Sequence, residues 1–313
     1  MNFADRLFGA VQAKNSVVCV GLDPRLDRIP AFLVQKMVED HGMTLECIAE
    51  IFIAFNKGII DAIADLVPVV KPQVAFYEQY GFQGMRAYEV ICKYARSKGL
   101  LVLADGKRND IGSTAEAYAS AFLGEIDVFG QPQMAPMEAD ALTVNAYLGY
   151  DGIGPFVDSC REHGKGLFVL VKTSNPSSGD LQDRITADEN ISIHELMAHF
   201  VESWGQDLIG ACGYSSIGAV VGATYPKEAE KLRKLMPESI LLVPGYGAQG
   251  GSAEDVKPCF NKDGFGAIIN NSRGILFAYE KNPATKGGED YAEAARDAVI
   301  KMNEELNRVR SSL

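Results

Sequence analysis

The stretch Leu100-Leu101-Val102-Leu103-Ala104-Asp105-Gly106-Lys107-Arg108-Asn109-Asp110 passes from an unbroken apolar run into a cluster of charged residues. Such a run is typical of a strand that is buried on both faces, as in a parallel sheet covered by helices. A helix-like segment, Ser113 to Leu123, follows almost at once. The stretch therefore predicts one strand–loop–helix unit with charged side chains where the strand ends.

The same unit recurs along the chain. Eight candidate strands are Val17 to Leu22, Val67 to Val70, Leu100 to Ala104, Ala141 to Val144, Leu167 to Val171, Ile217 to Val221, Ile240 to Val243 and Ala267 to Asn270. Helix candidates separate them, and Tyr291 to Leu306 closes the chain. Eight such units favour a single (β/α)₈ TIM barrel over residues 1–313. A doubly wound open sheet is the alternative, but Asp23-Pro24-Arg25 follows the first strand where a glycine-rich dinucleotide fingerprint would stand.

Three segments exceed a minimal barrel: Asp23 to Met43, Glu125 to Asp140 and Asn175 to Asn190. Inserted loops beside strand ends usually line or cover a site, and we expect the same here. Surface decoration is an equal alternative for the second segment. The role of residues 125–140 is not predicted.

Composition and charge exclude several classes of function. The 313 residues carry 30 Lys and Arg against 41 Asp and Glu, a net charge of −11, which argues against binding to nucleic acid or to anionic membranes. Six scattered cysteines without a C-x-x-C pair indicate free thiols in a reducing compartment. The first residues do not resemble a secretion signal, and no apolar segment approaches a membrane span. We expect a cytoplasmic protein.

Charged residues gather at the predicted carboxyl ends of strands, where barrel enzymes place their sites. Asp105 and Lys107 are two positions apart and would share a face of an extended strand, while Asp110 lies farther along. Lys71 follows the second strand and Asp23 the first. Each has an ordinary alternative, such as a solvated turn or a helix cap, but their joint placement favours a catalytic cluster.

The last two strand ends predict a phosphate site. Pro244-Gly245-Tyr246-Gly247-Ala248-Gln249-Gly250-Gly251 follows strand seven, and Asn270-Asn271-Ser272-Arg273-Gly274 includes the end of strand eight. Barrel enzymes often hold phosphate between these two loops. Glycines such as Gly250 let backbone amides approach an anion, and Gln249 supplies an amide donor. Arg273 supplies a guanidinium group that can bind phosphate through bidentate hydrogen bonds. The glycines also suggest a loop that closes over its ligand.

Together these motifs resemble the orotidine 5′-phosphate decarboxylase family. The resemblance rests on Asp105-x-Lys107-x-x-Asp110, on Lys71 and on the glycine-rich loop, and it spans Val17 to about Phe277. Relatives in the same superfamily that act on phosphosugars with magnesium share the first motif. They typically carry a carboxylate at the position of Lys71. The ammonium group of Lys71 would instead repel a metal ion. The resemblance therefore implies a decarboxylase that uses no metal and no cofactor.

The resemblance also implies a role for each site residue. Lys71, Asp105 and Lys107 would act with Asp110 of a second subunit in a homodimer, and Ile111 and Thr114 would cross with Asp110. Asp23 would contact the ribose, Ser174 the pyrimidine, and Gln249, Gly250 and Arg273 the phosphate. The substrate would be orotidine 5′-monophosphate and the product UMP, with Lys107 stabilising and then protonating a carbanion at C6. This is the last step of de novo pyrimidine nucleotide synthesis.

Two other functions remain open. The first is a magnesium-dependent phosphosugar decarboxylase or synthase, which Lys71 disfavours. The second is a barrel that binds a nucleotide as a sensor or scaffold, which would have no need of Lys107 beside Asp105. A histidine metal site has little support, because His194 and His199 are five residues apart and not the four that aligns two side chains on a helix.

Overall fold

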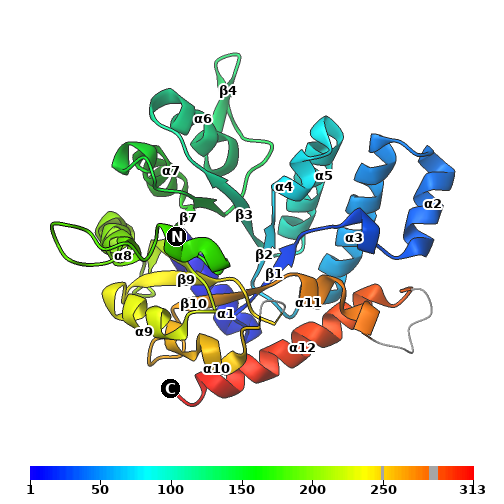
Figure 1. The fold of residues 1–313 in the computed structure, drawn as a ribbon. Helices are drawn as coiled ribbons and strands as arrows, with labels where there is room; N and C mark the ends of the chain where they lie inside the picture. Colours follow the sequence, from blue (N-terminus) through cyan, green and yellow to red (C-terminus); the bar gives the residue numbers. More distant parts are fainter. Residues whose placement is uncertain (248–249, 282–287) are drawn as a thin grey trace.

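The computed structural model describes residues 1–247, 250–281 and 288–313. Eight parallel strands close into a barrel in the spatial order β1-β10-β9-β8-β7-β6-β3-β2 (Figure 1). Their bounds are β1 Val18–Leu22, β2 Val69–Pro72, β3 Leu101–Arg108, β6 Ala141–Val144, β7 Gly166–Lys172, β8 Ser215–Val221, β9 Ser239–Val243 and β10 Ala267–Asn271. The barrel closes where Val18 of β1 pairs with Ile269 of β10. The predicted (β/α)₈ TIM barrel is confirmed.

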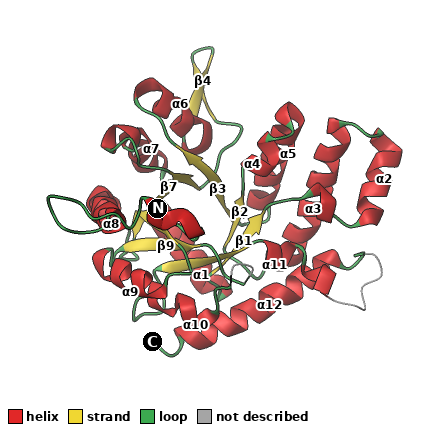
Figure 2. Ribbon diagram, in the orientation of Figure 1, coloured by secondary structure: helices red, strands yellow, loops and turns green. Residues whose placement is uncertain are grey.

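Helices surround the barrel (Figure 2). Their bounds are α1 Phe3–Lys14, α2 Ala31–His41, α3 Leu45–Ile63, α4 Ala75–Glu78, α5 Gly81–Ser97, α6 Gly112–Leu123, α7 Gly154–His163, α8 Ile193–Gly205, α9 Pro226–Leu235, α10 Ala253–Val256, α11 Arg273–Leu276 and α12 Tyr291–Arg310. Among the residues the structure describes, no helix is long and apolar enough to cross a membrane.

Local sequence explains where two of these helices begin. The hydroxyl of Thr44 accepts the N–H of Cys47 at 3.1 Å and caps the start of α3. Ser192 and Glu195 form a reciprocal capping box at the start of α8. In both cases a side chain satisfies a backbone donor that has no partner inside the helix.

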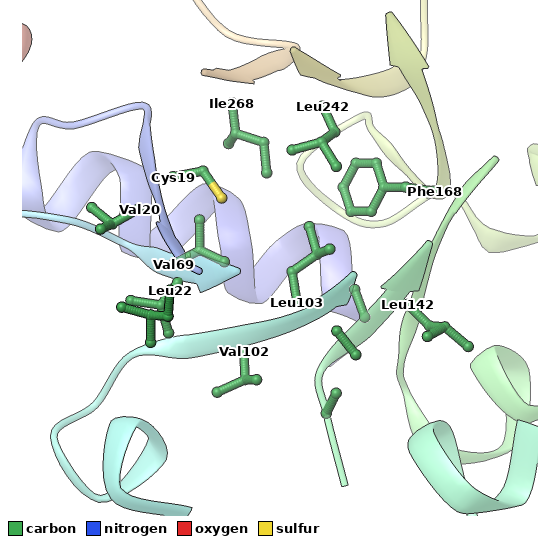
Figure 3. Packing of buried hydrophobic residues seen from close by; sticks show 14 of the residues in the cluster. Cys19, Val20, Leu22, Val69, Val102, Leu103, Leu142, Phe168, Leu242 and Ile268 are labelled. Carbon is green, nitrogen blue, oxygen red and sulfur yellow. The ribbon is translucent and has the colours of Figure 1, made fainter. Parts of the chain in front are cut away.

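Apolar side chains from several strands fill the interior of the barrel. Figure 3 shows Cys19, Leu103, Phe168, Leu242 and Ile268 pointing toward one another. All five are at most 2% exposed. This packed centre makes the barrel a rigid frame, so that the residues at the strand ends are held in fixed positions.

Several strands extend farther than their apolar runs predict, and in β2 and β3 the added residues include those of the charged cluster. Strand β2 runs to Pro72 and includes Lys71, and β3 runs to Arg108 and includes Asp105 and Lys107. Their polarity predicts that these charged residues follow the strands. Lys71 and Asp105 can lie within the strands because their charges are matched across the sheet, as described below, and so need no exposure to water.

The segment Glu125 to Asp140 contains a two-stranded hairpin, β4 Glu125–Val128 and β5 Gln131–Met134, beside α6 in Figure 1. It lies between α6 and β6, on the connection that enters β6 at its amino end. Barrel sites form at the opposite, carboxyl ends of the strands. The hairpin is therefore a surface feature away from the charged cluster, whereas the other two long segments follow the carboxyl ends of β1 and β7.

Candidate active site

The carboxylate of Asp105 is the centre of the charged cluster. Its Oδ2 lies 2.6 Å from Nζ of Lys71 and accepts a hydrogen bond from the Gln73 amide at 3.0 Å. Its Oδ1 lies 2.5 Å from Nζ of Lys107 and accepts the Thr143 hydroxyl at 2.9 Å. Both oxygens thus receive one cation and one neutral donor, and the predicted meeting of Lys71, Asp105 and Lys107 is observed.

The backbone around Lys107 is irregular. Pairing between β3 and β6 shifts register between Ala104 and Arg108. Within this shift Lys107 adopts a φ of 46°, in the left-handed region that side chains other than glycine rarely occupy. The Lys107 ammonium nevertheless contacts Asp105. Simple i, i+2 alternation along a strand therefore predicted the contact but not the left-handed backbone conformation of Lys107.

Charge pairing keeps these buried groups ionised. Burial alone would raise the pKa of Asp105, but the ammonium groups of Lys71 and Lys107 hold that pKa well below its usual value. Burial would likewise lower the pKa of Lys71, yet the carboxylates of Asp105 and Asp23 outweigh it and raise the pKa. Side-chain exposure is 5% for Lys71 and 9% for Asp105, against 45% for Lys107. Lys107 is therefore the most exposed member of the cluster.

A cavity of about 360 Å³ opens beside this cluster. Asp23, Lys71 and Arg273 line it, together with residues of the loops after β9 and β10. Burial is the main reason that the pKa of Asp23 is raised, and Lys71 opposes the rise. The Oδ1 atom of Asp23 is buried without a hydrogen-bond partner among the described residues. An unpaired buried acceptor is costly, so this oxygen is suited to a ligand's hydroxyl.

The predicted phosphate residues divide between the described and undescribed parts of the chain. Arg273 begins α11 and faces the cavity that Asp23 and Lys71 also line. Gly250 has a φ of 96° and donates its N–H to the carbonyl of Gly247 at 3.0 Å. Only glycine adopts such backbone readily, which explains its place in this turn. Gln249 lies outside the described residues.

Asp110 does not join the cluster of its own chain. Its carboxylate accepts the N–H of the next residue, Ile111, at 2.8 Å. Ile111 is 52% exposed, lines a separate cavity of about 680 Å³ and immediately precedes α6, whose Thr114 is also exposed. Asp110 itself is partly buried, but the exposure of Ile111 and Thr114 is what a surface available to a second chain requires.

Ser174 follows β7 at the carboxyl end of the barrel and is partly buried. Its carbonyl accepts the Thr224 hydroxyl at 3.4 Å. Among the described residues that line the 360 Å³ cavity, Ser174 does not appear. The structure thus places Ser174 at the correct end of the barrel without giving its hydroxyl a contact to the charged cluster.

Sequence reasoning missed two residues that bind Asp105. Thr143 belongs to the apolar run Ala141–Val144 and carried no signal of function. Gln73 stood two positions after Lys71 without an assigned role; its Oε1 accepts the N–H of Ala75 at 3.3 Å, which turns its amide nitrogen toward Asp105. The i, i+2 relation of Gln73 to Lys71 was the one signal available for it.

The orotidine 5′-phosphate decarboxylase / HUMPS family model matches residues 16–287 of this chain. The chain belongs to this family. Among relatives of the decarboxylase family, an orotidine 5′-phosphate decarboxylase from Rhodopirellula baltica is 46% identical over 308 residues, covering 98% of this chain and 99% of the relative. The match includes the strand ends that form the cluster around Asp105.

Solved structures agree with the family. The OMP decarboxylase of Leishmania donovani is 29% identical, with a TM-score of 0.75 and complete coverage of both chains. The UMP synthase of the same organism is 31% identical with a TM-score of 0.75; 99% of this chain covers 57% of that longer one. Among the described residues of this chain, no three His, Cys, Asp or Glu side chains are grouped to hold a metal ion.

Proposed function

We propose that this chain converts orotidine 5′-monophosphate to UMP and CO₂, as a carboxy-lyase of pyrimidine nucleotide synthesis. The observation that carries the proposal is the Lys71–Asp105–Lys107 cluster at the mouth of the barrel. Family membership and near full-length identity to decarboxylases support the same reaction.

The cluster stabilises the negative charge that develops on the substrate by electrostatic interaction, and not by delocalising the electrons into a cofactor. Loss of CO₂ from C6 leaves a carbanion, and the Lys107 ammonium favours negative charge there before it donates its proton to C6. A substrate carboxylate placed beside Asp105 adds repulsion; two unit charges about 4 Å apart interact by roughly 4 kcal/mol at an effective dielectric near 20. Departure of CO₂ relieves that repulsion.

The rest of the cavity binds the nucleotide away from the reacting carbon. Arg273, Gln249 and Gly250 hold the phosphate, Asp23 accepts a ribose hydroxyl and Ser174 contacts the pyrimidine. The unpaired Oδ1 of Asp23 and the position of Arg273 in the same cavity support the first part of this assignment. Phosphate binding contributes energy that helps exclude water from the cluster.

The active form is a homodimer in which Asp110 of each subunit completes the cluster of the other, and Ile111 and Thr114 cross with it. The exposed side chains of Ile111 and Thr114 beside Asp110 support this, because they are available to a second chain. We also infer one catalytic domain over residues 1–313. Six free cysteines support a cytoplasmic location.

Ultraviolet absorbance of orotidine 5′-monophosphate tests the proposal directly. The purified protein should convert it to UMP at the same rate with and without EDTA. Lys107→Ala should lose nearly all turnover and still bind UMP, whereas Lys93→Ala, which removes a helix-surface lysine, should remain fully active. Activity of Lys107→Ala equal to the wild type, or no conversion by the folded wild type, contradicts the proposal.

A further inference from the structure

Thr143 is buried at the carboxyl end of β6, the barrel strand next to β3. It is 1% exposed and lies among apolar neighbours of that strand. A buried hydroxyl needs partners, and the partners of this one are Asp105 and Lys107. Thr143 therefore contacts both charged residues of β3 from the adjoining strand.

The direction of its two hydrogen bonds is determined by chemistry. Asp105, held ionised by two lysines, can only accept, so Oγ1 of Thr143 donates its single proton to Oδ1 at 2.9 Å. The backbone N–H of Lys107 can only donate, so the same Oγ1 accepts it at 3.0 Å. One hydroxyl thus links the orientation of the carboxylate to the backbone position of the lysine.

This link lies at an irregularity in the pairing of the sheet. The pairing of β3 with β6 is interrupted between Ala104 and Arg108 and resumes with Arg108 opposite Val144. Lys107 falls within the interruption and adopts the left-handed φ of 46°. Such backbone persists only where its surroundings hold it. The Thr143 hydroxyl supplies the acceptor for the N–H of Lys107 at this point.

We propose that Thr143 is a positioning residue for decarboxylation: it holds Lys107 and Asp105 in register with each other and touches no substrate atom. This inference rests on the proposed function of the cluster. Its physical reason is that a displacement of about 1 Å in a catalytic group can reduce turnover about 100-fold while leaving a remote binding site intact.

The experiment compares Thr143→Val, which keeps the shape and removes the hydroxyl, with Thr143→Ser, which restores it. We expect Thr143→Val to lower kcat by about 10- to 100-fold with less than a threefold change in UMP affinity, and Thr143→Ser to stay within threefold of the wild type. Ser215→Ala is the matched control. The buried Ser215 hydroxyl also donates one hydrogen bond, to the carbonyl of Gly205, and accepts one N–H, that of Ile217, but it lies at the amino end of β8, away from the cluster.

Each outcome decides the inference. Wild-type kcat in folded Thr143→Val overturns it, and so does loss of UMP affinity in parallel with kcat, which indicates general damage. If Thr143→Val does not fold, Thr143→Ala is compared with Thr143→Ser: a folded Ala variant as active as the Ser variant overturns the inference. If the wild-type protein does not decarboxylate the substrate, the proposed function is overturned instead. The wild-type assay alone distinguishes that failure from a failure of the inference about Thr143.

Discussion

Replacing Lys71 with methionine should destabilise the folded protein far more than loss of an average ion pair. Nζ of Lys71 lies 2.6 Å from Oδ2 of Asp105, and the side chains are only 5% and 9% exposed. Removing one member of a buried pair leaves the other charge without compensation and costs about 3–5 kcal/mol. Lys107 still pairs with Asp105 but is 45% exposed, so we expect about 3 kcal/mol of the total unfolding free energy to be lost.

The loss should depend on pH in a definite direction. In the wild type the pKa of Asp105 is lower in the folded state than in the unfolded state. The stabilising contribution of Asp105 is therefore present above its unfolded-state pKa and is lost as the pH falls through its folded-state pKa. Without Lys71 the pKa of Asp105 rises, and its protonation on acidification removes the uncompensated charge. The difference in unfolding free energy between wild type and Lys71→Met should therefore narrow between pH 7 and pH 4.

Urea unfolding at one protein concentration, followed by circular dichroism at several pH values, measures both quantities. Lys93→Met is the control: Lys93 is 62% exposed and pairs with Glu89 one helical turn away, so its loss should cost about 0.5 kcal/mol or less. A loss below about 1 kcal/mol for Lys71→Met at pH 7, or a difference that widens on acidification, refutes the reasoning.

Three further predictions concern the phosphate end, the dimer and the packing. Arg273→Ala removes a charged donor from the cavity and should weaken UMP about 10- to 100-fold with little effect on uridine; equal affinity of the variant and wild type for UMP would contradict the phosphate assignment. Mixing Asp110→Asn with Lys107→Ala protein should restore some activity through sites that carry both intact residues, and no recovery despite subunit exchange argues against a shared site. Gly84→Ala should lower the unfolding free energy by about 1–3 kcal/mol, because its Cβ would lie 1.9 Å from the Tyr77 carbonyl oxygen. Gly9→Ala, on the exposed face of α1 with nothing within 4 Å of the new Cβ, should raise it by about 0.5–1 kcal/mol, and equal effects of the two substitutions in thermal melts would refute this.

Most strand positions were predictable because a barrel strand is buried on both faces and appears as a continuous apolar run. Ala141–Val144 agrees with its prediction at both ends. The prediction fell short at Lys71 and at Lys107, which polarity placed in loops. The partner of Lys71 is Asp105, 34 residues away, and no local pattern reveals that a charge will be paired at such a distance.

The site was predictable to the same extent and for a related reason. Parallel strands bring their carboxyl ends to one rim, so the residues found there along the sequence lie at the same end of the barrel. Thr143 could not be found in this way, because a threonine in an apolar run is an ordinary strand residue. Its role depends on the register of β6 beside β3 and on the interruption at Lys107.

The (β/α)₈ architecture, the family and the charged residues of β2 and β3 can be inferred from the order of amino acids alone, because burial on two faces and motif spacing are local properties of the chain. The folded barrel is needed to show which donors surround Asp105, that Oδ1 of Asp23 is buried without a partner among the described residues, and that Asp110 stays outside the cluster of its own chain. These depend on the register between strands and on the direction of each side chain at the barrel's rim. Contacts between residues distant in sequence arise only when the barrel closes.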